Sequence, residues 1–408
     1  MVPKVGRGGG VVAIRARRFR WWLLAGGVST VCLPLTAAVL PEDRADFLFH
    51  HYEGGGVTIN GPSIQARKQL GQSVSISGNY YVDSISSASI DVVTTASPYQ
   101  EEREEMSLGV DLLNDNVTVS TAVSVSEEND FEAKTFHFTI SQDMLGDLTT
   151  VSLGYSRGWD TVGQTMTDPS DPSGERRMRD PDFNESVNRQ SYRFALSQIL
   201  TKKLIVNFAF DTVTDEGYLN NPYRKARYLD SGNEAGFSWQ GELYPRTRTS
   251  RAASLRFSYY LPNRAALQGE YRLFNDSWDI EGTNIGLKYI WPLKGGWLVD
   301  FGVRQYRQSS ASFFVDLMPY AGAQSYFGRD KELSAFSNNT LGFGVTYDLK
   351  NTFWKRIHRG SLNFKYDRIS FNYDEFRDLS GNSLPAPGSE PLYSFSADVF
   401  QAYLSLWY

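Results

Sequence analysis

The stretch SADVFQAYLSLWY, residues 396–408, alternates between two kinds of side chain. Its apolar face consists of Phe400, Ala402, Leu404, Leu406 and Tyr408. The intervening positions carry Gln401, Tyr403, Ser405 and Trp407. A period of two is typical of a β-strand whose two faces meet different surroundings.

The same alternation recurs along the chain in segments of about ten residues, the length that a tilted strand needs to cross a bilayer. These segments are residues 73–83, 148–160, 191–200, 204–211, 253–261, 266–274, 284–291, 297–306, 341–347 and 361–373. A soluble β-sandwich is the alternative, but its core would need further sheets to cover every apolar face. The pattern therefore favours a membrane barrel.

The connections between these segments are of two lengths. Short turns are expected at residues 70–72, 114–116, 146–147, 202–203, 263–264 and 294–296, and long polar loops at 161–189, 214–250, 308–336 and 375–394. Short turns on one rim and long loops on the other are typical of an outer-membrane barrel. We predict an all-β, antiparallel, up-and-down transmembrane barrel of about 16 strands over residues 54–408. Residues 39–53 form its first strand or a periplasmic segment, and the latter would leave 14 strands.

The first 38 residues have the layout of a cleaved signal peptide. Basic residues precede an apolar run from Trp21 to Leu40, with small residues before Pro41. The only cysteine, Cys32, lies in this segment. Without residues 1–38, which hold six basic and no acidic residues, 35 basic residues face 46 acidic ones and the net charge is −11. A nucleic-acid partner is therefore not expected.

Residues 84–105 do not fit the strand pattern. The Ser- and Ala-rich part lacks both an apolar face and the charge of a solvated loop. We expect this segment to fold into the lumen and to narrow it, with a surface hairpin as the alternative. The candidate constriction residues are Asp83, Asp91, Glu101, Glu102 and Arg103.

Charged residues within the strands give a second set of candidates. A basic residue facing lipid at mid-membrane would cost about 2–4 kcal/mol, so these side chains should face the lumen or lie at the rims. Asp300 and Arg304 are separated by an even number of residues and share one face of their strand. We expect both to line the lumen.

Several strings of the sequence carry a resemblance to a known family. They are LPEDR at 40–44, GGG at 54–56, GP at 61–62, RK at 67–68, NYYVDSISSASIDVVTTASPYQEER at 79–103, and SQDMLGDLTTVSLGYSRGWD at 141–160. In these strings the chain resembles an uncharacterised family of predicted outer-membrane β-barrel proteins of Gram-negative bacteria. The resemblance implies an integral outer-membrane location. It implies no substrate and no catalytic residue.

The resulting functional hypothesis is a channel or transporter for small hydrophilic solutes. The lipids and lipopolysaccharide of the outer membrane are its expected surroundings. We expect the assembly machinery to read Phe400, Leu404, Leu406 and Tyr408 as its signal. The alternative is a structural or conduit barrel that serves a periplasmic partner.

An enzymatic or metal-binding function is a weaker alternative. An outer-membrane hydrolase would depend on His137 or Ser156, but the sequence around Ser156 continues a strand rather than turning into a helix. His50 and His51 are candidates for a metal site. Adjacent residues of a strand point to opposite faces, which argues against shared ligation. We expect no enzyme activity, cofactor or metal.

Overall fold

The computed structural model describes residues 39–87, 99–171, 177–349, 357–381 and 385–408. The expected signal peptide, residues 1–38, lies outside this part. Sixteen antiparallel strands close into a barrel in which every strand pairs with its neighbours in the chain, and β1 pairs with the last strand, β19. The predicted fold and its higher strand number are confirmed. Within the described residues, no helix is long and apolar enough to cross a membrane.

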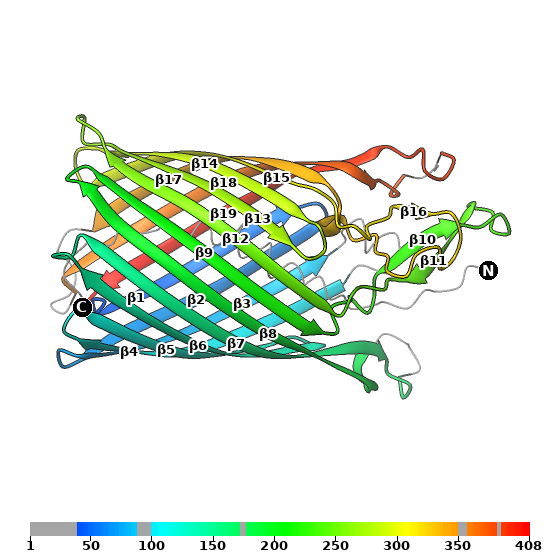
Figure 1. Ribbon diagram of the computed structural model, residues 1–408, viewed down its shortest axis with the longest axis horizontal. Helices are drawn as coiled ribbons and strands as arrows, with labels where there is room; N and C mark the ends of the chain where they lie inside the picture. Colours follow the sequence, from blue (N-terminus) through cyan, green and yellow to red (C-terminus); the bar gives the residue numbers. More distant parts are fainter. Residues whose placement is uncertain (1–38, 88–98, 172–176, 350–356, 382–384) are drawn as a thin grey trace.

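The barrel strands in chain order are β1 (Arg44–Gly54), β2 (Val57–Leu70), β3 (Val74–Ser87), β4 (Tyr99–Asn114), β5 (Val117–Glu127), β6 (Phe131–Met144), β7 (Thr149–Thr167), β8 (Arg177–Thr201), β9 (Leu204–Gly217), β12 (Thr247–Tyr260), β13 (Ala266–Asp276), β14 (Glu281–Pro292), β15 (Trp297–Gln308), β17 (Phe336–Leu349), β18 (Arg359–Arg377) and β19 (Leu392–Trp407). The strands are tilted against the long axis of the barrel (Figure 1). The turn between β1 and β2 is made by Gly55 and Gly56 at φ 58° and 75°, a conformation that suits glycine.

The outer surface of the barrel is an apolar belt. On β14, for example, Ile285 and Leu287 are 55 % and 46 % exposed, whereas the intervening Gly286 faces the lumen. Phe301 and Val303 on β15 continue the same belt. An exposed apolar surface of this extent around a closed barrel is the surface that contacts lipid. The protein is therefore an integral outer-membrane barrel.

The two rims differ as predicted. The C-terminus lies at one end with short turns, and the long connections lie at the other end, where the β1–β2 and β5–β6 turns are also short (Figure 1). Short turns face the periplasm in such barrels. The long-loop end is therefore the extracellular end.

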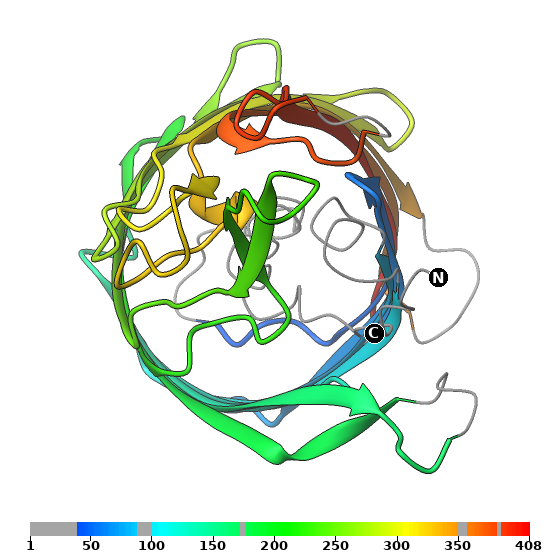
Figure 2. The same cartoon turned by 90° about the vertical axis from the view of Figure 1, so that its right-hand side faces the viewer.

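The long loops fold into ordered structure. A three-stranded sheet comprises β10 (Lys225–Leu229), β11 (Phe237–Gly241) and β16 (Leu317–Met318). The 3-10 helix η1 (Lys331–Leu333) follows β16. We call residues 218–246 and 309–335 the cap, because these loops lie within the circle of the barrel wall when viewed from the extracellular end (Figure 2).

The prediction that residues 84–105 fold inward needs a correction. Residues 84–87 extend β3, residues 99–105 extend β4, and the two strands pair up to Ser87 and Tyr99. The alternation continues here, because Ile85 is 4 % exposed and packs with Val57 and Ile59, whereas Ser84 and Ser86 face outward. Small polar residues suit an outer face that meets water. Residues 88–98 lie outside the described part.

Candidate functional site

A cavity of about 920 Å³ occupies the lumen. Its wall is formed by β7, β8, β9, β12 to β15, β17 and β18. The cap contributes Glu332 and Leu333 to the same lining. The cavity thus lies between the barrel wall and the inner side of the cap.

Charged side chains of both signs line this cavity. They include Arg193, Asp211, Arg256, Glu270, Arg272, Lys288, Asp300, Arg304, Lys365 and Asp367. Asp300 and Arg304 therefore occupy the lumen position that their spacing predicts. Ser, Thr and Asn side chains lie among these charges, and apolar side chains such as Ile205, Phe257 and Leu333 complete the lining, so the wall is of mixed polarity.

Most of these charges are paired across neighbouring strands. Arg256 Nε lies 3.0 Å from Glu270 Oε2, and Lys288 Nζ lies 2.9 Å from Asp300 Oδ1. Arg304 Nη2 donates a hydrogen bond to Thr340 Oγ1 at 3.2 Å. The pairs fix the side chains against the wall and leave space in the middle of the lumen.

Glycines make room for two of the carboxylates. Asp300 lies directly opposite Gly344, and a Cβ atom at Gly344 would lie 2.2 Å from Asp300 Oδ2. Asp367 lies opposite Gly342, where a Cβ atom would lie 2.4 Å from its Oδ1. Both acidic side chains can therefore lie flat against β17.

The candidate constriction residues lie elsewhere. Asp83, Glu101 and Arg103 are buried on the inner face near the extracellular rim, and none of them lines the 920 Å³ cavity. Glu102 is exposed on the opposite face of β4, as the alternation requires. Asp91 lies outside the described residues. The structure thus separates Asp83, Glu101 and Arg103 from Asp300 and Arg304.

Asp83 is the centre of a buried polar network. Its Oδ1 lies 2.7 Å from His50 Nε2 and accepts a hydrogen bond from Tyr81 Oη at 2.9 Å. Arg103 Nη1 lies 3.6 Å from Asp83 Oδ2, and Arg103 Nη2 donates to Glu105 at 2.6 Å. Such a network fixes β1, β3 and β4 to one another at the rim.

The two candidate metal-binding histidines point to opposite faces of β1. The His50 side chain is 1 % exposed, stacks on Tyr81 and contacts Asp83. The His51 side chain is 35 % exposed, and its Nδ1 contacts Asn60 Oδ1 at 2.5 Å. The two imidazoles therefore share no site.

His137 and Ser156 are direct neighbours across β6 and β7. His137 Nδ1 lies 2.9 Å from Ser156 Oγ. A catalytic dyad usually has a third group that orients the imidazole. Among the described residues, no carboxylate forms a hydrogen bond with the other ring nitrogen of His137.

Sequence reasoning missed the ionic network that joins the cap to the barrel. Arg227 on β10 is completely buried, and its Nη1 donates to Glu390 at 2.5 Å. Its Nη2 donates to Asp316 Oδ2 at 2.5 Å. Arg329 Nε also donates to Asp316, at 3.0 Å. The sequence feature that indicates ordered structure here is the presence of two aromatic residues, Phe237 and Trp239, in a loop that was expected to be polar.

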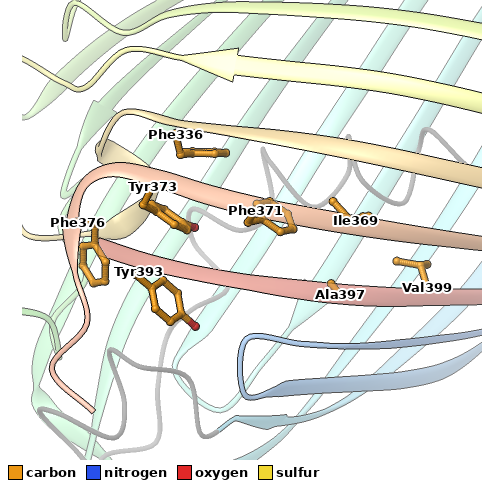
Figure 3. Close-up of a cluster of buried hydrophobic side chains, with 8 residues drawn as sticks. All are labelled: Phe336, Ile369, Phe371, Tyr373, Phe376, Tyr393, Ala397 and Val399. Atoms are coloured by element: carbon orange, nitrogen blue, oxygen red, sulfur yellow. The ribbon is translucent and has the colours of Figure 1, made fainter. Parts of the chain in front are cut away.

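A second part of the lumen wall is apolar. Figure 3 shows its eight residues on or next to β17, β18 and β19: Phe336, Ile369, Phe371, Tyr373, Phe376, Tyr393, Ala397 and Val399. Phe336, Ile369 and Phe376 are at most 1 % exposed. This cluster packs beneath the extracellular loops and supports the β18–β19 hairpin there.

The expected assembly residues lie on the outer face of β19. Phe400 is 40 % exposed, and Leu404 and Leu406 lie on the same face of β19 because even numbers of residues separate them from Phe400. Tyr408 is 36 % exposed, and its hydroxyl donates to the Arg67 carbonyl at 2.9 Å. This face meets lipid next to the closing β1–β19 seam.

Solved structures with a similar fold are outer-membrane proteins. A bacterial polysaccharide outer membrane secretin has 6 % identity and a TM-score of 0.45, with 90 % of this chain and 99 % of that chain covered. The CymD monoaromatic hydrocarbon channel has 8 % identity and a TM-score of 0.41, with 90 % and 89 % covered. For the siderophore receptor PirA from Pseudomonas aeruginosa the identity is 11 %, the TM-score 0.40 and the share of this chain 91 %. This chain spans only 64 % of the length of PirA.

No curated protein matches the chain in sequence. A family model described as "Protein of unknown function (DUF3570)" matches residues 89–367, which is more than half of the chain. The match covers the barrel from the β3–β4 connection to β18. The chain belongs to this family, DUF3570.

Proposed function

We propose that the protein is an outer-membrane channel for small hydrophilic solutes. The observation that carries the proposal is the lumen cavity, whose wall presents paired charges of both signs along β12 to β18. The charged side chains of this wall can replace the water molecules that hydrate a polar solute, whereas an apolar solute forms no such interactions with them. The proposal assigns no catalysis and no cofactor to the barrel.

The proposed constriction is the cap rather than residues 84–105. Residues 84–87 and 99–105 belong to the barrel wall, whereas the cap supplies Glu332 and Leu333 to the lining of the cavity. The buried ion pairs of Arg227 hold the cap in place. Loosening these ion pairs should widen the route to the lumen.

Single-channel recording of the purified mature protein in a planar bilayer tests the proposal. Gly286→Trp places a large side chain in the cavity, because a Cβ atom at Gly286 meets nothing closer than 3.9 Å. We expect stable conductance steps that Gly286→Trp reduces. Ile285→Trp, on the lipid face of the same strand, is the matched control and should leave the steps unchanged.

The cap is tested in the same recordings. Arg227→Met leaves Glu390 without its buried cation and leaves Asp316 with Arg329 alone, so we expect larger or more frequent openings. Arg246→Met removes an arginine that is 68 % exposed and should behave like the unchanged protein. If neither the unchanged protein nor Arg227→Met gave conductance steps, the result would contradict the proposal that the protein is a channel.

The competing proposal is a structural or conduit barrel that conducts little by itself. The specific observation in its favour is the cap, which is joined to the β18–β19 loop by the fully buried Arg227–Glu390 ion pair. Such a barrel would give no steps in the recordings. Co-purification of a periplasmic protein would then identify its partner.

A further inference from the structure

Three buried carboxylates converge at the extracellular rim, away from the lumen cavity. Glu101 on β4 and Glu128 and Asp130 in the β5–β6 turn are 7 %, 8 % and 1 % exposed. One oxygen of each lies within 4.8 Å of one oxygen of each of the others. Like charges at this distance, away from water, repel one another strongly.

One carboxylate oxygen of this group lacks a hydrogen bond. Asp130 Oδ2 accepts a hydrogen bond from Tyr223 Oη at 2.5 Å, but Asp130 Oδ1 is fully buried and has no hydrogen-bond partner within the described residues. A buried acceptor of a charged group that has no partner destabilises the fold. The orphaned oxygen therefore points to a ligand that satisfies it.

Two guanidinium groups of the described residues lie near the three carboxylates, and each of them also pairs with another acidic side chain. Arg103 Nε lies 3.7 Å from Glu128 Oε1, but the two terminal nitrogens of Arg103 face Asp83 and Glu105. Arg179 pairs with Glu132 at 2.7 Å.

The pKa values of two of these carboxyl groups reflect their burial beside one another, at a level above the membrane. Burial, and then the charges of Asp130 and Glu128, raise the pKa of Glu101 to about 9. Burial also raises the pKa of Asp130 to about 7. Glu102 and Glu104 lie exposed on the outer face beside these residues, which places this level of the wall outside the hydrocarbon.

We propose that Glu101, Glu128 and Asp130 bind a divalent cation of the calcium type. Such ions take carboxylate oxygens at about 2.4 Å, so two ligand oxygens on one ion lie up to about 4.8 Å apart. The measured spacing of the three carboxylates fits this limit. The ion supplies the partner of Asp130 Oδ1.

The site lies where the cap is attached to the rim. Tyr223 belongs to the cap, and its hydroxyl both donates to Asp130 and accepts a hydrogen bond from the Thr165 amide at 2.5 Å. Phe131 and Val162 pack beside this junction, with Tyr223 against them. Cation binding therefore stabilises the attachment of residues 218–246 to β7 and to the β5–β6 turn.

Calcium titration of the mature protein tests the site. The protein is folded in phosphocholine detergent micelles free of lipopolysaccharide, treated with EDTA, dialysed and titrated with CaCl₂ in a calorimeter. We expect one saturable site whose affinity falls at least tenfold in Glu128→Gln and in Glu101→Gln. Glu102→Gln removes the same charge from the outer face and should bind as the unchanged protein does.

Circular dichroism and the heat-dependent shift in gel mobility show whether each variant is folded, and only folded variants are compared. Absence of saturable binding to the unchanged protein would overturn the proposal. Equal binding by Glu128→Gln and Glu101→Gln, or an equal loss in Glu102→Gln, would overturn it as well. None of these outcomes depends on whether the barrel conducts.

Limited proteolysis with trypsin tests whether cation binding stabilises the attachment of the cap. Lys225 is exposed next to the buried Arg224. We expect CaCl₂ to slow cleavage after Lys225 several-fold in the unchanged protein and not in Glu128→Gln. Equal rates with CaCl₂ and with EDTA in the unchanged protein would overturn the attachment role.

Discussion

Gly344 shows how a single residue shapes the lumen wall. It pairs with Asp300 across β15 and β17, and the missing side chain gives the Asp300 carboxylate room beside Lys288. The alternation of side chains along the strand predicts that Asp300 faces inward. It does not predict the need for glycine opposite, because that depends on which residue of β17 is the cross-strand partner.

We therefore expect Gly344→Ala to destabilise the barrel by about 1–3 kcal/mol, because the methyl group displaces Asp300 and disturbs its pair with Lys288. Urea unfolding in lipid vesicles, followed by tryptophan fluorescence, measures the change. Gly286→Ala is the control, since its Cβ atom has free space on the same lumen face. An equal loss in both variants would show that the clash is not the cause.

At the scale of one strand, β14 separates its two environments by alternation. Leu287 is 46 % exposed on the lipid face, and Asn284 lines the cavity on the other. Both faces were predictable from the sequence, since the period of two is a local property of the backbone. The register with β13 and β15 then places these faces in the belt and in the lumen.

Leu287→Lys should cost about 2–4 kcal/mol of stability, because the ammonium group would enter hydrocarbon. Asn284→Lys places the same group in the lumen and should change stability by less than about 1 kcal/mol. Urea unfolding of both variants in the same vesicles makes the comparison. Similar losses would mean that the assignment of the faces of β14 is wrong.

At the scale of the whole molecule, the cap brings together residues that the sequence separates widely. Glu242 in the cap accepts a hydrogen bond from Tyr244 Oη, and it accepts one from the Arg329 amide at 2.6 Å. Burial and the charge of Asp330 raise the pKa of Glu242 to about 7, although Arg224 opposes them. The closed cap therefore holds a proton that an exposed glutamate releases near pH 4.5.

Because the closed state binds more protons between about pH 4.5 and 7, stability of the closed cap falls as pH rises through this window and is constant above it. We expect amides of β10 to exchange with deuterium about 70-fold faster at pH 8 than at pH 5, after correction for the intrinsic rate. Glu242→Gln should remove the dependence. Faster corrected exchange at pH 5 would contradict the prediction.

The sequence alone determined the barrel, the two rims and the faces on which Asp300, Arg304 and Asp83 lie, and it left the strand number open between 14 and 16. Each of these follows from alternation or from loop length, which are local properties of the chain. The inward fold of residues 84–105 was predicted wrongly for the described parts of that segment. Alternation there continues with serine on a wet outer face, which removes the apolar signal.

Only the tertiary structure decided the cap and the carboxylate site. Arg227 and Glu390 are 163 residues apart, and Asp130 and Tyr223 are 93 apart. Loops have no fixed period, so their sequence does not encode which distant side chains they meet. These contacts form because the closed barrel brings the extracellular loops together above one lumen, where burial requires each charge to find a partner.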